Sequence, residues 1–127
     1  MNRTVYDTRF FVEFFYSKDK ELRKRIREKK QNKEKYISAV VIHELYHISL
    51  VREGRETAKL RVALMKKDFQ VIHVDDELAQ MSAELRHRYN LTMGDSMIAA
   101  TAAMLNAVCV SDDPHFQQIQ EIKTEWI

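Results

Sequence analysis

Four acidic side chains stand where they could bind a divalent cation together. Asp95 lies near the start of the helical stretch GDSMIAAT, and Asp113 follows AVCV, which has the pattern of a buried strand. Asp7 comes after the short strand candidate TVY, and Glu44 lies within a long helical stretch. Acids that converge on one spot repel each other unless a cation neutralises them. Their oxygens suit Mg²⁺ or Mn²⁺, which activate water and stabilise charge on a phosphoryl oxygen. The set therefore predicts phosphodiester hydrolysis.

Three of these acids also have an ordinary structural explanation when each is taken alone. Asp7 precedes a helix and could cap it, and Asp113 belongs to an Asp-Pro pair, which is a good helix start. Asp95 follows Thr92 by three residues, a spacing that resembles a capping box, and an acid in the first turn favours the helix dipole. The individual positions therefore leave capping and metal binding both open.

The fourth acid, Glu44, lies in the predicted helix 38–53. On a helical wheel Val41, Leu45 and Ile48 share one face, and Glu44 falls at the flank of that face. A carboxylate at the flank is partly dehydrated and needs a partner or a cation. An ordinary salt bridge would satisfy it, but together with the other three acids a metal site accounts for it better.

The same helix carries a competing motif, His43-Glu44-Leu45-Tyr46-His47, which matches H-E-x-x-H. In zinc hydrolases of this pattern the two histidines bind Zn²⁺ and the glutamate is the general base. The wheel places both histidines off the apolar face, and no third ligand stands out in the sequence. We therefore expect an exposed histidine pair, and a zinc hydrolase is the less favoured alternative.

The elements that must position these acids alternate between strands and helices. Such alternation predicts one α/β domain over residues 1–127, a three-layer α/β/α sandwich with a central, mainly parallel sheet. The reactive site of such a fold lies beyond the carboxyl ends of the strands, where Asp7 and Asp113 fall. We expect strands at 4–7, 69–74, 107–110 and 121–127, helices at 8–16, 38–53, 55–67, 75–90 and 92–106, a charged helical stretch at 18–35, a short link at 36–37, and a short helix from Pro114.

Charge and composition narrow the class of protein. The net charge is +2, but residues 18–35 contain ten basic and four acidic residues. This segment could hold phosphates, with Lys24, Arg25 and Arg27 as weak candidates, or it could be a solvated helix with internal ion pairs. The one cysteine, Cys109, is expected to be a buried apolar residue. Without a signal-peptide pattern or a membrane-spanning apolar run, we expect a soluble, cytoplasmic protein.

Taken in order, these motifs resemble the PIN domain family. The resemblance rests on D-T after the first strand, E-L in the helix 38–53, GDSMIAATA, and then VSDDPHF, and it covers essentially the whole chain. In size and helix content the chain is similar to VapC-type toxins of toxin–antitoxin pairs. Arg9 departs from the pattern, because the family commonly has Asn or Ser after D-T, so a cation is expected beside the site.

The resemblance implies a Mg²⁺- or Mn²⁺-dependent endoribonuclease that acts on RNA, forms a homodimer and is inhibited by a small antitoxin. A catalytically idle module that binds RNA or a partner is the alternative. The implied catalytic and metal-binding residues are Asp7, Glu44, Asp95 and Asp113, supported by the hydroxyl groups of Thr8 and Ser111 and by the extra carboxylate of Asp112.

Overall fold

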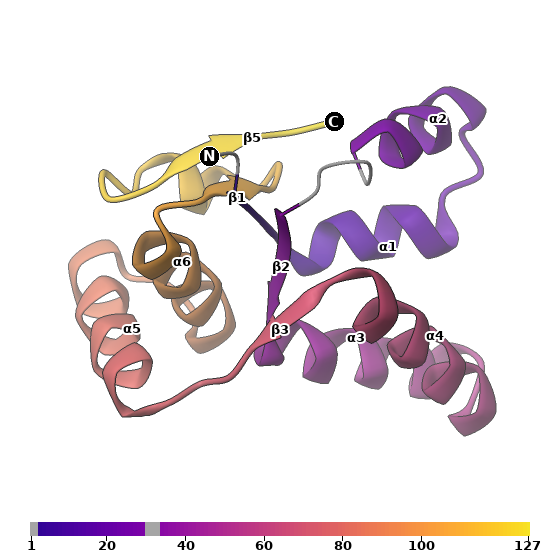
Figure 1. Cartoon of the computed structure of the whole chain (residues 1–127), viewed down its shortest axis with the longest axis horizontal. Coiled ribbons are helices and arrows are strands. Elements are labelled where there is room, and N and C mark those ends of the chain that lie inside the picture. The colour runs from indigo at the N-terminus through magenta and orange to yellow at the C-terminus, as the bar shows by residue number, and fades with distance from the viewer. Residues whose placement is uncertain (1–2, 30–33) are drawn as a thin grey trace.

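The structure is a computed structural model that describes residues 3–29 and 34–127. Its centre is a five-stranded sheet in the order β3-β2-β1-β4-β5, in which every neighbouring pair is parallel (Figure 1). This confirms the predicted α/β fold with a parallel sheet. The strands are β1 (Arg3–Tyr6), β2 (Glu34–Ser38), β3 (Gln70–Ile72), β4 (Val108–Val110) and β5 (Lys123–Glu125).

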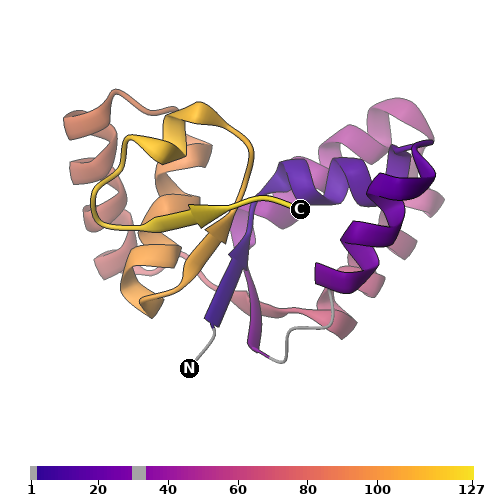
Figure 2. The ribbon, with the colours of Figure 1, turned by 90° about the horizontal axis from the view of Figure 1, so that it is seen from above.

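Helices cover both faces of the sheet. Figure 2 shows α5 and α6 on one side of the strands and α1 to α4 on the other. Helix α6 lies against β1, β2 and β4, and α5 packs on α6. The helices are α1 (Thr8–Tyr16), α2 (Lys20–Lys29), α3 (Ala39–Arg52), α4 (Arg55–Asp68), α5 (Asp76–Tyr89), α6 (Met93–Leu105) and α7 (Pro114–Gln117).

One predicted segment was wrong. The helical stretch was expected to run to residue 35 and to be followed by a link at 36–37, but α2 ends at Lys29 and Glu34–Ser38 is strand β2. Positions 30–33 of that prediction lie outside the described residues. The sequence pattern did not predict this strand, because only its last two residues are buried and its first two are charged. Its position is fixed by pairing with β1 on one side and β3 on the other, which local periodicity does not report.

The strands at the two edges of the sheet were predicted at the right places but are shorter than expected. β3 covers Gln70–Ile72 and β5 covers Lys123–Glu125. Both strands present exposed charged or polar residues, and such short edges limit pairing with other chains. The inner strands β1 and β4 carry the buried residues on which the site depends.

Helix α6 begins and ends with clear local signals. The Thr92 side chain accepts a hydrogen bond from the backbone of Asp95, and Asn106 ends the helix in the left-handed conformation at φ 51°. Between them Ala99, Ala100 and Ala102 are fully buried. Small side chains let the helix axis approach the sheet closely. Asp95, in the first turn of α6, lies close enough to Asp7 at the end of β1 for its charge to raise the pKa of Asp7.

Aromatic side chains make the core between the sheet and α1. Tyr6, Phe10 and Phe11 are fully buried, and Phe69 packs edge-on against both Tyr6 and Phe11 with ring centroids 5.0 Å away. The Tyr6 hydroxyl donates to the carbonyl of Lys29 at 2.9 Å, which ties α2 to β1. This packing fixes the start of α1 relative to the end of β1.

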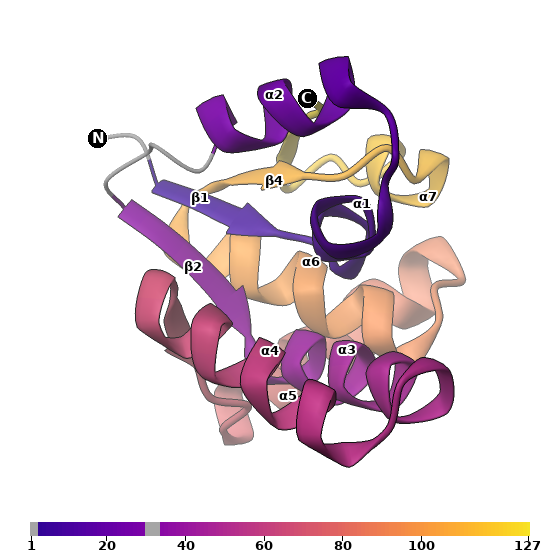
Figure 3. The ribbon, with the colours of Figure 1, turned by 90° about the vertical axis from the view of Figure 1, so that its right-hand side faces the viewer.

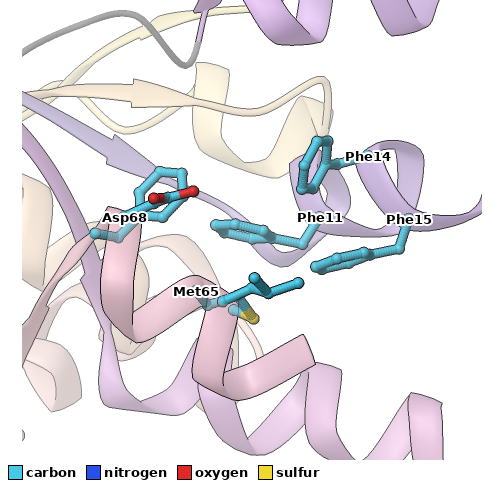
Figure 4. A pocket seen from close by; sticks show the side chains of 7 residues that line it. Phe11, Phe14, Phe15, Met65 and Asp68 are labelled. Carbon is cyan, nitrogen blue, oxygen red and sulfur yellow. The ribbon is translucent and has the colours of Figure 1, made fainter. Parts of the chain in front are cut away.

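Farther along α1 the aromatic packing is looser. Phe14 and Phe15 are half-buried, and a small cavity of about 120 Å³ lies between them and α4. Figure 4 shows the rings of Phe11 and Phe15 on the side of Met65, with Phe14 on the far side of Phe11. The expected burial of Cys109 is confirmed, and burial raises the pKa of its thiol.

Within residues 3–29 and 34–127, none of the helices combines the length and the apolar character that crossing a membrane requires.

Candidate active site

The site is built where the carboxyl ends of β1 and β4 lie side by side. Asp7 follows β1, and its backbone N–H donates to the carbonyl of Val110 at the end of β4. Ser111 follows β4, and its hydroxyl donates to Asp7 Oδ2 at 2.6 Å. The Thr8 backbone N–H donates to the other oxygen, Asp7 Oδ1, at 2.7 Å. Figure 3 shows β1, β2 and β4 pointing toward the same end of the molecule, where α1 begins.

Asp7 is the most deeply buried of the acids, with only 3% of its surface exposed. Burial raises its pKa to about 7, although the Ser111 hydroxyl and the Thr8 N–H oppose the change. The nearby charges of Asp95 and Glu44 raise the pKa further. A carboxyl group held in this way at neutral pH needs a proton or a cation to balance its charge.

Asp95 lies in the first turn of α6, where its own backbone N–H is capped by Thr92 at 3.2 Å. Its side chain is half-buried. Burial raises the pKa of Asp95, and the charges of Asp113 and Glu44 add to the effect. Asp95 therefore lies within electrostatic reach of the other three acids, since it also raises the pKa of Asp7.

Glu44 reaches the same place from α3. The Thr8 hydroxyl donates to Glu44 Oε1 at 2.6 Å, so one threonine bonds two of the acids, through its backbone and its side chain. The other oxygen, Glu44 Oε2, lies over Gly94, where a Cβ would come within 2.8 Å of it. Gly94 was not predicted to matter, and a glycine beside an acid in sequence gives no signal of such a contact.

Asp113 caps α7 and binds His115 twice. Asp113 Oδ1 accepts from the His115 backbone at 2.9 Å and lies 2.7 Å from His115 Nδ1. In the described residues, one group of side chains is close enough to hold a metal ion, namely Asp95, Asp113 and His115, with ligand atoms within 4.8 Å of one another. His115 was missed by sequence reasoning, although its place two residues after Asp113 was a usable signal.

Asp112 and Asp113 are adjacent in sequence but differ in their environment. Arg9 donates to both oxygens of Asp112, from Nε at 3.1 Å and from Nη2 at 2.9 Å. These bonds lower the pKa of Asp112. The positively charged group expected beside the site is therefore the Arg9 guanidinium, which pairs with Asp112. Asp113 instead lies near Asp95 and the other acids.

The two histidines of the H-E-x-x-H motif lie apart from this group. His43 and His47 are exposed, whereas Glu44 between them is half-buried and bonded to Thr8. Neither histidine belongs to the metal-capable group that the described residues contain. The expected exposure of the pair is thus observed, and the described residues place no third zinc ligand beside the two histidines.

The weak RNA-contact candidates lie on α2. Lys24, Arg25 and Arg27 are all exposed, and Arg25 forms an i,i+4 ion pair with Glu21 at 3.7 Å. The solvated-helix interpretation therefore describes part of this segment, and phosphate contact by these side chains stays a prediction.

Sequence comparison assigns the chain to a family. The PIN domain model matches residues 4–122, so the chain belongs to the PIN domain family. None of the curated protein sequences matches it.

Solved structures share this fold at low sequence identity. A chain of the DNA-bound VapBC from Salmonella typhimurium superposes with a TM-score of 0.81 at 20% identity, covering 99% of this chain and 98% of that one. A chain of VapBC2 from Rickettsia felis, bound to a promoter DNA fragment, gives 0.80 at 18%, covering 98% of each. Mycobacterium tuberculosis VapC20, a sarcin-ricin loop cleaving toxin, gives 0.75 at 18%, covering 94% of this chain and 98% of its own. At these identities the likeness establishes the fold.

Proposed function

We propose that this chain is a divalent-metal-dependent endoribonuclease and the toxin of a toxin–antitoxin pair. Membership of the PIN domain family and the fold shared with VapBC chains support this class. The observation that carries the proposal is the set of Asp7, Glu44, Asp95 and Asp113, which come from four segments and act on each other as like charges. Among the described residues, no Lys or Arg forms an ion pair with any of them.

The donor chemistry of the site fits Mg²⁺ or Mn²⁺. Its carboxylate oxygens are hard ligands, and the buried Asp7 would be balanced by a cation. We assign Asp7, Glu44, Asp95 and Asp113 as the residues that would hold it. When bound, the ion supplies an activated water and stabilises charge on the phosphoryl oxygen.

The hydroxyl residues hold the acids in place. Ser111 bonds Asp7, and Thr8 bonds both Asp7 and Glu44, which fixes these two carboxylates relative to the sheet. Rigid carboxylates lose little freedom when a ligand binds, and this favours affinity. Ser111 and Thr8 are therefore positioning residues in this proposal.

RNA is the proposed substrate, with support from VapC20, whose name describes it as a toxin that cleaves the sarcin-ricin loop. A small antitoxin is the proposed partner, because several similar chains come from VapBC and FitAB structures. The homodimer, the cytoplasmic location and the single domain over residues 1–127 stay predictions.

A catalytically idle binding module is the second candidate. It is favoured by one observation: Asp7 and Asp113 do cap helices α1 and α7. A carboxylate has about four lone-pair sites on its two oxygens, so accepting a capping hydrogen bond does not exclude binding a cation. The two functions differ in whether the acids bind a cation.

The deciding experiment is cleavage of a labelled, structured RNA by the purified protein with Mg²⁺, Mn²⁺, Zn²⁺ or EDTA. We expect cleavage with Mg²⁺ or Mn²⁺ and a loss of about 100-fold or more in Asp95→Asn, because the variant removes a charged ligand from the site. Circular dichroism should show the variant folded. Wild-type rates in Asp95→Asn would reject the assignment, and the absence of saturable Mn²⁺ binding would favour the binding module.

A further inference from the structure

At the rim of the acidic site, Arg9 joins the first turn of α1 to the loop that follows β4. It is the second residue of α1, and its guanidinium bonds Asp112, in the loop after β4, through two parallel hydrogen bonds of 3.1 and 2.9 Å. Glu13 lies 3.8 Å from the same Nη2 atom. The side chain is 49% exposed, so the guanidinium is both fixed by protein groups and accessible to solvent.

The planar guanidinium of Arg9 has N–H donors that its bonds to Asp112 do not use. The bond to Asp112 uses the edge of the guanidinium formed by Nε and Nη2. A guanidinium has five N–H donors in one plane, so the edge between Nη1 and Nη2 can bind a second oxyanion while the first edge stays paired. Within the described part of the chain, Nη1 of Arg9 donates no hydrogen bond to a protein group.

The position of Arg9 relative to the acids gives this edge a use. Arg9 follows Thr8, which bonds Asp7 and Glu44, and its partner Asp112 precedes Asp113. The bonds to Asp112 raise the pKa of Arg9, and the charges of Glu13 and Asp7 contribute as well. A phosphodiester that approaches four carboxylates is repelled, and a fixed cation at their rim offsets this repulsion for a phosphate seated against it.

We propose that Arg9, held by Asp112, is a phosphate-binding residue that seats the RNA backbone beside the acidic site. This rests on the proposed function, because it assumes that RNA is the substrate. Asp112 is then a positioning residue rather than a fifth metal ligand. Its charge keeps the guanidinium at the rim and prevents it from neutralising the acids. The competing explanation is an ion pair that only connects α1 to the loop after β4.

The test measures RNA binding without catalysis. A short fluorescein-labelled single-stranded RNA is titrated with protein in EDTA, and anisotropy is followed at several salt concentrations. We expect Arg9→Ala to weaken binding about tenfold and to reduce the salt dependence by about 0.7 in slope, which corresponds to one lost phosphate contact. Arg9→Lys should keep the slope and lose about threefold in affinity, because lysine is a point charge without a fork.

Arg88→Ala is the matched control. Arg88 is 55% exposed and pairs with Glu121, as Arg9 pairs with Asp112, and neither Arg88 nor Glu121 acts on the pKa of Asp7 or Asp95. The control should bind RNA like the wild type. Asp112→Asn should resemble Arg9→Lys, because the guanidinium remains but is less firmly held.

Three results would overturn the proposal. The first is unchanged RNA affinity in Arg9→Ala, which would mean that the ion pair only connects α1 to the loop after β4. The second is tighter Mn²⁺ binding by Arg9→Ala with unchanged RNA affinity. That result would mean that Arg9 only keeps Asp112 from binding a cation. The third is no measurable RNA binding by the wild type in EDTA. Arg9-dependent binding without any cleavage would instead reject the nuclease and keep the phosphate site.

Discussion

Two clusters of polar groups in this protein are both partly buried, yet they are balanced in opposite ways. Around Arg61 on α4, the guanidinium pairs with Glu53 and bonds the hydroxyl groups of Tyr16 and Ser49. It also stacks over the Tyr16 ring, 4.6 Å from the ring centroid. One positive charge thus meets one negative charge and two hydroxyl groups, all supplied by the chain itself.

In the acidic site at the ends of β1 and β4, no Lys or Arg of the described ranges pairs with Asp7, Glu44, Asp95 or Asp113. Burial and the charges of neighbouring acids raise the pKa of Asp7 and of Asp95. The hydrogen bonds to the acids come chiefly from the neutral groups of Ser111 and Thr8. A cluster that serves stability is expected to satisfy its own charges, because uncompensated burial is costly. The Arg61 cluster therefore has the composition expected of a group that stabilises the fold, whereas the acids have the composition required by the cation site proposed above. Each of the following substitutions tests one side of this contrast.

The largest effect on stability is expected from Asp7→Asn. The folded-state pKa of Asp7 is about 7, above the ordinary 3.8, so the folded protein binds more protons than the unfolded chain between these values. The stability from this group is full at low pH and is lost as the pH rises through that window. Without metal, Asp7→Asn should therefore exceed the wild type in unfolding free energy at about pH 8, by on the order of 4 kcal/mol at most.

The measurement is thermal or urea unfolding of both proteins across this pH range, with and without Mn²⁺. Near pH 4 the two should be equally stable, and Mn²⁺ should stabilise the wild type more than the variant at the higher pH. A variant that is less stable than the wild type at every pH would show that Asp7 is only a helix cap.

Arg61→Ala should lower the unfolding free energy, whereas Asp7→Asn should raise it at high pH. Removing the cation leaves Glu53 and two hydroxyl groups without their partner, and we expect a loss of about 2 kcal/mol in unfolding free energy. The loss should not depend on Mn²⁺. Arg52→Ala is the control, since Arg52 is exposed and stacks on Tyr16 at 4.4 Å from the ring centroid, so it should cost less than about 1 kcal/mol. Equal losses in urea unfolding would contradict the contrast.

Gly94→Ala should impair the site without harming the fold. The new Cβ would lie 2.8 Å from Glu44 Oε2, and the flexible end of Glu44 would have to move. We expect Mn²⁺ affinity and RNA cleavage to fall about tenfold, while helix propensity keeps stability equal or slightly higher.

Gly54→Ala is the matched control for this substitution. Gly54 has a φ of 95° and open space around its Cα, so alanine there is strained but touches nothing. It should lose about 1 kcal/mol of stability and keep its metal affinity. If Gly94→Ala bound Mn²⁺ like the wild type, Glu44 would have no part in holding the cation.

The smallest effect is expected from His47→Ala. His47 is exposed and lies outside the metal-capable group of the described residues, so cleavage, metal content and stability should all match the wild type. Metal content is measured by elemental analysis of the purified protein. Stoichiometric Zn²⁺ that disappears in His47→Ala would establish the zinc hydrolase instead.

Much of the fold could be predicted because local patterns report local physics. The capping residues Thr92 and Asp113 mark helix starts, and apolar runs mark the buried β4 and the aromatic start of α1. Strand β2 could not be found in this way. Its two buried residues are too few to form a pattern, and pairing with β1 and β3 makes it a strand.

The sequence alone identified the candidate acids and, apart from β2, the alternating strands and helices that bring them to the carboxyl ends of a parallel sheet. Only the tertiary structure decided which groups touch. In the folded chain Glu44 lies over Gly94, and His115 lies beside Asp95 and Asp113. Asp112 accepts hydrogen bonds from Arg9. The physical reason is that caps and periodicity act within a few residues, whereas the pKa of Asp7 and the partner of Asp112 depend on charges and hydrogen bonds contributed across the whole chain.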